Sequence, residues 1–251
     1  MTATFLRYLE QLETRHLSDL RFSDVTRALR ALSSTYVERR ETALAAHKAL
    51  DGAGKRAAFA LYYGPLHFLL IEHIIRELAP ALSPGTVVDL GCGTGVGGAA
   101  VALQQPNLRV LGLDVHPWAL AEARFTYNTF NLRADVRRGD ASKTHFPGDT
   151  SIVVAAFAVN ELHDRDRSEL LMKLRQLGAR GGAGGARRVL IVEPISQRIS
   201  PWWEDWAAEF LKIGGRADTW KARIDPPPIV KRLAKASGLR PELLTARSLF
   251  V

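Results

Sequence analysis

The chain has few of the features that mark disulfide-bonded, metal-binding or membrane proteins. It contains one cysteine among 251 residues, which excludes an internal disulfide, and no group of Cys and His residues has metal-ligand spacing. The first residues lack the apolar core of a signal peptide, and no apolar run approaches membrane-spanning length; the run at 68–75 is broken by Glu72 and His73. We therefore predict a cytoplasmic protein without a metal ion and without a membrane contact.

The composition predicts a folded protein and leaves its partner open. Hydrophobic residues make up 47% of the chain and charged residues 24%, so the chain can bury an ordinary core. The net charge of +8 favours an anionic partner, nucleic acid above all. Because the basic residues are scattered and form no dense block, an Arg-rich soluble protein without such a partner is equally compatible with the sequence.

The residues from 86 to 102 form the stretch around which the rest is organised. Their apolar, β-branched start predicts a buried parallel strand, and the Ala/Val run at their end predicts a helix. Glycines at 91, 93 and 95 lie between the two, where they permit a tight turn and the approach of a ligand to the main chain. The helix that follows offers N–H groups to a polar part of that ligand.

Two cofactor classes use such a turn. Gly93, Gly95 and Gly98 match the G-x-G-x-x-G fingerprint of dinucleotide-binding proteins. Asp89, however, stands at the end of the strand, where its carboxylate would repel a pyrophosphate. S-adenosylmethionine (SAM) carries an ammonium and a sulfonium group but no phosphate, and it therefore suits this carboxylate better than NAD does.

Acidic residues also follow the next two predicted strands. Asp114 ends the strand at 109–114, where a carboxylate can accept both ribose hydroxyls of an adenosine. Because NAD and SAM both contain that ribose, Asp114 does not distinguish between them. The alternative role of Asp114 is to cap the helix that starts at Pro117. Asp140 follows the strand at 134–138, and it is either an acceptor for an adenine amino group or a turn residue.

Further strands are predicted at 151–158, 188–193 and 243–251, and the sequence leaves open whether a seventh closes the sheet. Helical periodicity covers residues 5 to about 50 and a segment ending at 78, and helices follow Pro201 and Pro226. Residues 178–186 read as a flexible connection. The fold class is α/β, with a Rossmann-like, doubly wound, mostly parallel sheet; we divide the chain into an N-terminal helical region, 1–82, and a cofactor-binding domain, 83–251.

The run Asp89-Leu90-Gly91-Cys92-Gly93-Thr94-Gly95 resembles the first motif of the class I, or seven-strand, SAM-dependent methyltransferases. Together with residues 159–162 and 191–194, it resembles the ribosomal small-subunit methyltransferase-like family of mitochondria and bacteria, over roughly residues 25 to 195. The cysteine cluster of the mitochondrial members is absent, so no iron–sulfur centre is carried over. The Asn/Asp-Pro-Pro-aromatic signature of enzymes that methylate exocyclic amino groups of bases is absent as well.

The resemblance implies a SAM site at the carboxyl ends of the strands. Asp89 and the glycine backbone would hold the methionine portion of SAM, Asp114 the ribose and Asp140 the adenine; Cys92 is a small filler of the loop rather than a nucleophile. The full set of predicted cofactor-binding residues is Asp89, Gly91, Cys92, Gly93, Thr94, Gly95, Asp114, Val115, Asp140, Ala141, Ala156 and Phe157.

Three residues are candidates for the transfer step. Glu161 is the candidate general base, and Asn160 and Tyr63 are candidate orienting groups. Two of them have a structural alternative: Glu161 as a carboxylate in the first turn of a helix, and Tyr63 as a packing residue. Three functions stay open on the sequence: a methyltransferase for ribosomal RNA or the small ribosomal subunit, a small-molecule methyltransferase, and a SAM-binding assembly factor that transfers nothing.

Overall fold

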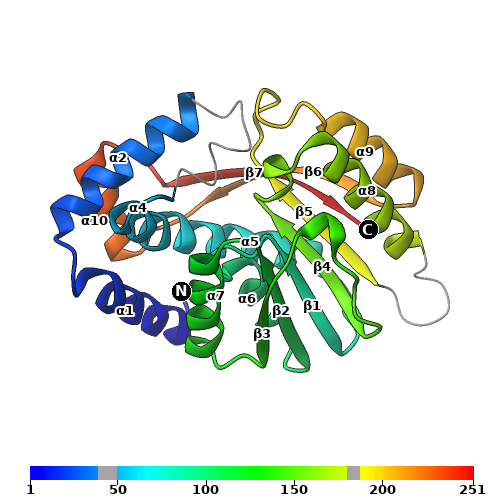
Figure 1. Cartoon of the computed structure of the whole chain (residues 1–251), viewed down its shortest axis with the longest axis horizontal. Helices are drawn as coiled ribbons and strands as arrows, with labels where there is room; N and C mark the ends of the chain where they lie inside the picture. The colour runs from blue at the N-terminus through cyan, green and yellow to red at the C-terminus, as the bar shows by residue number, and fades with distance from the viewer. Residues whose placement is uncertain (39–49, 180–186) are drawn as a thin grey trace.

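The computed structural model describes residues 1–38, 50–179 and 187–251 (Figure 1). The predicted helix beyond residue 38 and the connection at 180–186 lie outside this description. The α-helices are α1 (Ala3–Leu17), α2 (Phe22–Glu38), α4 (Ala53–Ala58), α5 (Gly64–Leu78), α6 (Val96–Ala102), α7 (Pro117–Thr129), α8 (Asp164–Ala179), α9 (Trp203–Lys212) and α10 (Pro228–Ser237). Short 3₁₀ turns occupy Ala141–Lys143 and Val159–Glu161.

Seven strands form one mixed sheet. They are β1 (Gly85–Leu90), β2 (Leu108–Asp114), β3 (Ala134–Arg138), β4 (Thr150–Ala156), β5 (Arg188–Glu193), β6 (Arg216–Arg223) and β7 (Leu243–Phe250). Their order is β3-β2-β1-β4-β5-β7-β6. The first five strands are parallel, and β7 is antiparallel to both of its neighbours. The predicted doubly wound α/β fold is therefore confirmed, and the strand that the sequence left open is β6.

Alternate residues of the central strands enter two separate cores, one on each face of the sheet. Val87, Val110 and Val154 pack on the face that α5, α6 and α10 cover, whereas Val88 and Val153 pack on the face under α8 and α9. Both faces are buried, so these strands show the continuous apolar runs expected of a parallel sheet covered by helices. Figure 1 shows the two helical layers on either side of the strands.

The N-terminal helices share the first of these cores. Phe5 of α1 stacks on Phe68 of α5 with ring centroids 4.6 Å apart, and Tyr8 stacks on Phe130 at 4.9 Å. These side chains belong to one continuous apolar cluster with residues of the sheet. The division of the chain at residues 82 and 83 stays a prediction, because a shared core does not mark a boundary.

One long helix runs beside the sheet. It consists of α4, a π-helical turn at Phe59–Tyr63, and α5. By length and composition alone, Ala53–Leu78 is apolar enough to cross a membrane, with a mean hydropathy of 1.3, which the sequence-based reading of apolar runs overlooked. Of the most apolar window, 67% is buried inside the protein, as in the core helix of a soluble domain. A π turn within an α-helix is rare and is often found at a functional site.

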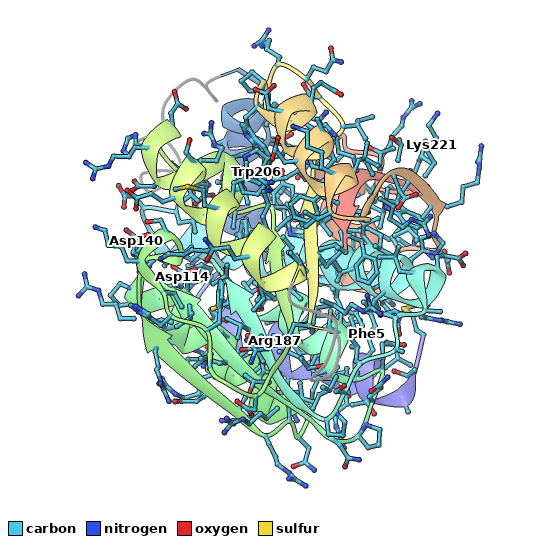
Figure 2. All side chains as sticks on the ribbon, turned by 90° about the vertical axis from the view of Figure 1, so that its right-hand side faces the viewer. Phe5, Asp114, Asp140, Arg187, Trp206 and Lys221 are labelled. Carbon is cyan, nitrogen blue, oxygen red and sulfur yellow. The ribbon has the colours of Figure 1, made fainter. Side chains whose placement is uncertain are left out.

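The three clustered tryptophans belong to the second core. Trp202, Trp203 and Trp206 are at most 8% exposed and pack with Phe210 under the sheet. Trp206, labelled in Figure 2, belongs to α9. These residues are therefore part of the core and are too buried to serve as a platform for a substrate.

Candidate cofactor and acceptor site

The loop between β1 and α6 depends on glycine at three positions. Gly91, Gly93 and Gly95 have φ angles of 61°, 51° and 78°, in the left-handed region that residues with a side chain rarely adopt. A Cβ on Gly95 would lie 2.8 Å from the Cα of Ala123, so α7 packs against the bare main chain there. A Cβ on Gly93 would meet only the carbonyl oxygen of Gly91, at 4.0 Å. The loop is therefore open to a ligand at Gly93.

Asp89 lies beneath this loop. Its carboxylate is buried, with the residue 2% exposed, and Oδ2 accepts hydrogen bonds from the Gly98 N–H at 2.8 Å and the Tyr127 hydroxyl at 3.2 Å. Burial raises the pKa of Asp89 to about 7, although both hydrogen bonds act to lower it. The carboxylate thus fixes the first turn of α6 to β1. A direct contact between Asp89 and the methionine portion of SAM stays a prediction.

Cys92 and Thr94 complete the loop as buried residues. Cys92 is 6% exposed and Thr94 is 3% exposed. Burial, with the nearby carboxylates of Asp89 and Asp114, raises the pKa of the Cys92 thiol well above its ordinary value. A thiol that stays protonated is a poor nucleophile, in agreement with the role of a small filler.

Asp114 joins the two loops that border the site. Its Oδ2 accepts the Gly93 N–H at 3.0 Å, and its Oδ1 accepts the His116 N–H at 2.8 Å. The cap of α7 is His116 itself, whose Nδ1 accepts the Trp118 N–H at 3.1 Å, so the alternative role of Asp114 as that cap is wrong. Each carboxylate oxygen of Asp114 retains a lone pair beside the open part of the glycine loop, which suits a ribose diol.

Asp140 lies at the end of the adjacent strand. It caps the 3₁₀ turn Ala141–Lys143 by accepting the N–H and the hydroxyl of Ser142, at 2.9 and 2.8 Å, which confirms its role in a turn. Burial acts to raise its pKa, but these hydrogen bonds and the charge of Lys143 outweigh burial and lower it. Figure 2 shows Asp114 and Asp140 on one side of the molecule, where Val115 is 40% exposed and Ala141 is partly buried. The adenine contact of Asp140 stays a prediction.

Ala156 and Phe157 end β4 on the other side of the glycine loop. Phe157 has a φ of 59°, a strained angle for a residue with a side chain, and its ring stacks on His67 of α5 at a centroid distance of 4.1 Å. The His67 ring lies 6.1 Å from Tyr63, and a Cβ on Gly64 would lie 3.4 Å from Oγ1 of Thr94. The π turn therefore brings Tyr63 to the edge of the sheet that carries the glycine loop.

Tyr63 belongs to an aromatic wall whose other members, Phe59, His67 and Trp118, the sequence did not single out. Phe59, Tyr63 and His67 recur at intervals of four, and Phe59 also contacts Trp118 of α7 edge to face at 6.3 Å. The repeat of aromatic rings every four residues was the available signal. The four side chains of this wall are partly buried. The wall borders the site from the helix that contains the π turn and, through Trp118, from α7.

Asn160 is tied into a buried polar network rather than pointing freely into the site. Glu193, at the end of β5 and fully buried, accepts the N–H groups of Val159 and Asn160 at 2.9 and 3.3 Å and the side-chain amide of Asn160. The Asn160 Oδ1 accepts from the Ser200 hydroxyl at 2.7 Å and from Trp202 Nε1 at 3.1 Å. Sequence reasoning missed Glu193 as a positioning residue, although the Glu-Pro end of a buried strand was its signal.

Glu161 follows this network on the 3₁₀ turn Val159–Glu161, where it is exposed. Its alternative role as a carboxylate in the first turn of a helix is met only by this short 3₁₀ turn, because α8 begins later, at Asp164. Among the residues that the structure describes, no group of three His, Cys, Asp or Glu side chains could hold a metal ion.

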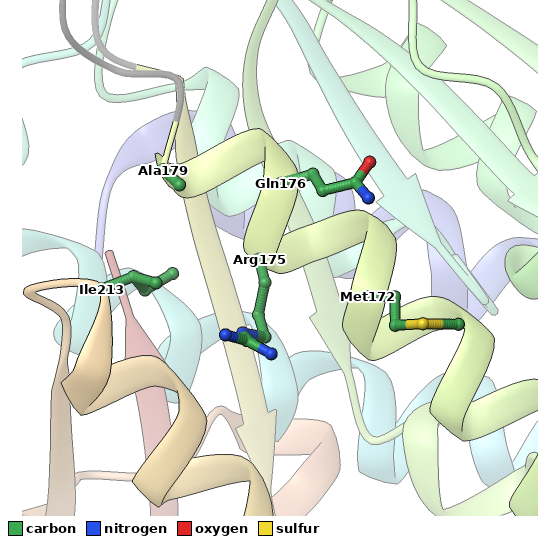
Figure 3. Close-up of a pocket in the computed structure, with 5 residues that line it drawn as sticks. All are labelled: Met172, Arg175, Gln176, Ala179 and Ile213. Carbon is green, nitrogen blue, oxygen red and sulfur yellow. The ribbon is translucent and has the colours of Figure 1, made fainter.

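A shallow hollow of about 250 Å³ lies away from these residues. Figure 3 shows its lining, which consists of Met172, Arg175, Gln176 and Ala179 of α8 and Ile213 after α9. These helices lie on the opposite side of the sheet from α6. The hollow is therefore separate from the site at the glycine loop.

The fold and the site together define a class of protein. A glycine loop after β1, an acidic residue at the end of β2, and a sheet in the order 3-2-1-4-5-7-6 with β7 reversed are the architecture of class I methyltransferases. Residues 87–182 match the family described as a methyltransferase domain. The chain therefore contains a class I SAM-dependent methyltransferase domain, as the glycine motif predicted. The cofactor of this family is SAM, and the open main chain at Gly93 and the acceptors of Asp114 fit it.

The curated relatives match only in part. The ribosomal RNA small subunit methyltransferase C of Pseudomonas putida (strain W619) is 33% identical over 125 residues, covering 43% of this chain and 36% of that protein. The protein of the same name from Actinobacillus succinogenes is 39% identical over 71 residues, covering 28% of this chain and 21% of that protein. The chain thus spans about a third or less of the length of these relatives.

A solved structure extends over nearly the whole chain. The mitomycin 7-O-methyltransferase structure covers 99% of this chain and 68% of its own, with a TM-score of 0.50 and 16% identity. This likeness shows the fold alone. The narrower resemblance to the small-subunit methyltransferase-like family stays a prediction, because the curated relatives carry a different name.

Proposed function

We propose that this protein transfers a methyl group from SAM to ribosomal RNA. One observation supports SAM as the cofactor. The carboxylate of Asp114 accepts hydrogen bonds from the N–H groups of Gly93 and His116, next to main chain that is open to a ligand at Gly93. The RNA part is supported by the names of the partial relatives and by the net charge of +8. The proposal includes a cytoplasmic location, because the partial relatives are bacterial proteins.

The chain mainly aligns the reactants. SAM supplies an already activated methyl group on its sulfonium, so correct placement accounts for most of the required rate enhancement. Asp114 and the glycine loop orient the cofactor, and the Glu193–Asn160 network holds the turn after β4 in position. Tyr63 and Phe157 border the acceptor side. Glu161, exposed at that edge, is the group that would accept a proton from the acceptor.

The first prediction concerns Asp114. The D114N substitution removes the charge that accepts the ribose hydroxyls, and hydrogen bonds to a charged group contribute about 1.5–3 kcal/mol, so SAM should bind roughly tenfold to a hundredfold more weakly. Calorimetric titration of the purified protein with SAM measures this, with NAD as the control ligand. D135N is the matched control variant, since it neutralises an exposed aspartate on β3. Equal SAM affinity in wild type and D114N would overturn the assignment.

The acceptor is tested separately with radiolabelled SAM. Transfer of label to protein-free small-subunit ribosomal RNA, lost in E161Q at unchanged SAM affinity, supports the RNA methyltransferase with Glu161 as its base. Transfer to metabolites but not to RNA would establish the small-molecule alternative. Normal SAM binding without transfer to intact subunits, RNA or metabolites would establish an assembly factor that is not an enzyme.

A further inference from the structure

The outermost strand of the sheet presents a basic face to solvent. In β6, Asp218, Trp220 and Ala222 turn toward the protein, and the Trp220 Nε1–H donates to the Ser248 hydroxyl at 2.8 Å. The residues between and beyond them, Thr219, Lys221 and Arg223, are exposed. Because side chains of a strand alternate between its faces, these three point the same way. We call them, together with Arg198, the β6 surface.

The loop that carries Arg198 is held beside this surface by Arg247 of β7. Thr219 pairs directly with Arg247, whose guanidinium donates to the carbonyl oxygens of Pro194 at 3.0 Å and Ser200 at 3.2 Å. These bonds hold the loop between β5 and α9 on the same face of the sheet. Arg198 is exposed on that loop.

The cations of the β6 surface are free to meet a ligand. Within the described residues, no hydrogen bond or ion pair occupies the side chain of Arg198, Lys221 or Arg223, unlike Arg216, which pairs with Asp218 at 2.7 Å. Glu242 lies on the other face, where its charge contributes to raising the pKa of Tyr62. Lys221 and Arg223 are two residues apart, so their main-chain positions differ by about 7 Å along the strand.

The β6 surface also lies at the same edge of the sheet as the proposed acceptor site. The pairing of β5 with β7 ends at Glu193 and Arg247, and the β6–β7 ladder continues beyond it through Lys221 and Arg223. The two strands therefore project past the edge where β4 and β5 present Phe157 and the Glu193 network. Figure 2 shows Lys221 on the opposite side of the molecule from Asp114. The cofactor loop thus lies over β1 and β2, and the β6 surface flanks the other side of the acceptor site.

We propose that the β6 surface binds the phosphate backbone of the RNA acceptor and guides one strand toward the turn after β4. This inference rests on the proposed function, and it names the part of the protein that contacts RNA outside the reacting nucleotide. Exposed cations without acidic partners are complementary to a polyanion, and each phosphate contact releases counterions. Leu243, 50% exposed and paired with Arg223, adds an apolar border.

The test compares two triple variants that remove the same charge. The first is R198Q/K221Q/R223Q; the second, R7Q/R124Q/R133Q, neutralises three exposed arginines of α1, α7 and the turn before β3 that have no ion pair in the described residues. The probe is protein-free small-subunit ribosomal RNA, titrated at several salt concentrations. The first variant should bind at least about tenfold more weakly, with a salt slope lower by roughly 0.7–0.9 per lost contact, and the second should bind like wild type.

Titration with SAM separates this inference from the function on which it rests. Both variants should bind SAM like wild type, which also shows that they are folded. Equal RNA affinity of both variants and wild type overturns the β6 surface alone, and equal weakening of both shows a response to net charge, which overturns it as well. Normal SAM binding with no RNA binding by wild type overturns the RNA acceptor and the β6 surface together.

Discussion

At the scale of single residues, Asp89 has the most unusual environment in the site. Within the part of the chain that the structure describes, its buried carboxylate interacts with two donors and no cation, and burial raises its pKa from 3.8 to about 7. The folded state therefore holds the proton more tightly than the unfolded chain does. Stability from this group is complete below about pH 4 and is lost as the pH rises to about 7.

The D89N substitution should remove this dependence. Asparagine resembles the protonated carboxyl group and can still accept from Gly98 through its amide oxygen. In cofactor-free protein, the free energy of unfolding of D89N relative to wild type should rise between pH 4 and pH 7 and level off above, by at most about 4 kcal/mol for a shift of this size. Urea unfolding at pH 4.5, 6 and 8 measures it. A difference that does not change with pH would show that Asp89 titrates normally.

At the scale of elements, the glycine loop separates a structural glycine from a ligand-facing one. Gly95 packs against Ala123 of α7, whereas Gly93 faces open space. Both have positive φ, so alanine costs roughly 1–2 kcal/mol of backbone strain at either position. Only at Gly95 does the added methyl group also collide with another element.

The two alanine variants should therefore differ. G95A should lose clearly more stability than G93A in urea unfolding, because its methyl group must displace α7. G93A should unfold within about 2 kcal/mol of wild type but bind SAM weakly, since its methyl group fills the space that the cofactor approaches. Calorimetry with SAM completes the comparison. A G93A variant that binds SAM like wild type would show that the cofactor lies elsewhere.

The elements also show which parts of the fold the sequence could predict. The central parallel strands were found because both of their faces are buried and their residues, such as Val87 and Val88, are apolar almost without interruption. The edge strand β6 was missed because only one face packs, which leaves Arg, Lys and Asp among its eight residues. Edge strands with charged side chains are common, since charge protects them from pairing with other chains.

The sequence could predict those site residues whose position depends only on the end of the strand that carries them. Asp114 and Asp140 lie where the strand pattern placed them. The contacts of His67 with Phe157 and of Glu193 with Asn160 join segments far apart in the chain, and no local spacing reports such pairs. The inward orientation of Asp89 was equally beyond local reasoning, because it depends on Tyr127 of α7.

At the scale of the whole molecule, the N-terminal helices and the sheet form one core. Ile71, Ile74 and Ile75 of α5 are at most 1% exposed and lie in the cluster that includes Val110 and Val154. Burial of a large aliphatic side chain contributes about 1.5–3 kcal/mol, so the six buried Leu, Ile and Phe residues of α5 contribute on the order of 10 kcal/mol. That is comparable to the entire stability of a typical domain, about 5–15 kcal/mol.

Residues 83–251 alone should therefore not fold into a native domain. Without α5, the face of the sheet that α6 and α10 also cover loses a large part of its cover, and the fragment should show poorly dispersed amide resonances and no cooperative transition in urea. Adding residues 1–82 as a separate chain should restore both, because the missing contacts are noncovalent. Cooperative unfolding of the isolated fragment would instead make residue 82 a genuine domain boundary and reduce the N-terminal helices to a cover. The aromatic wall of Phe59, Tyr63 and His67 would then be a dispensable addition to a complete cofactor site, rather than part of the core that holds that site together.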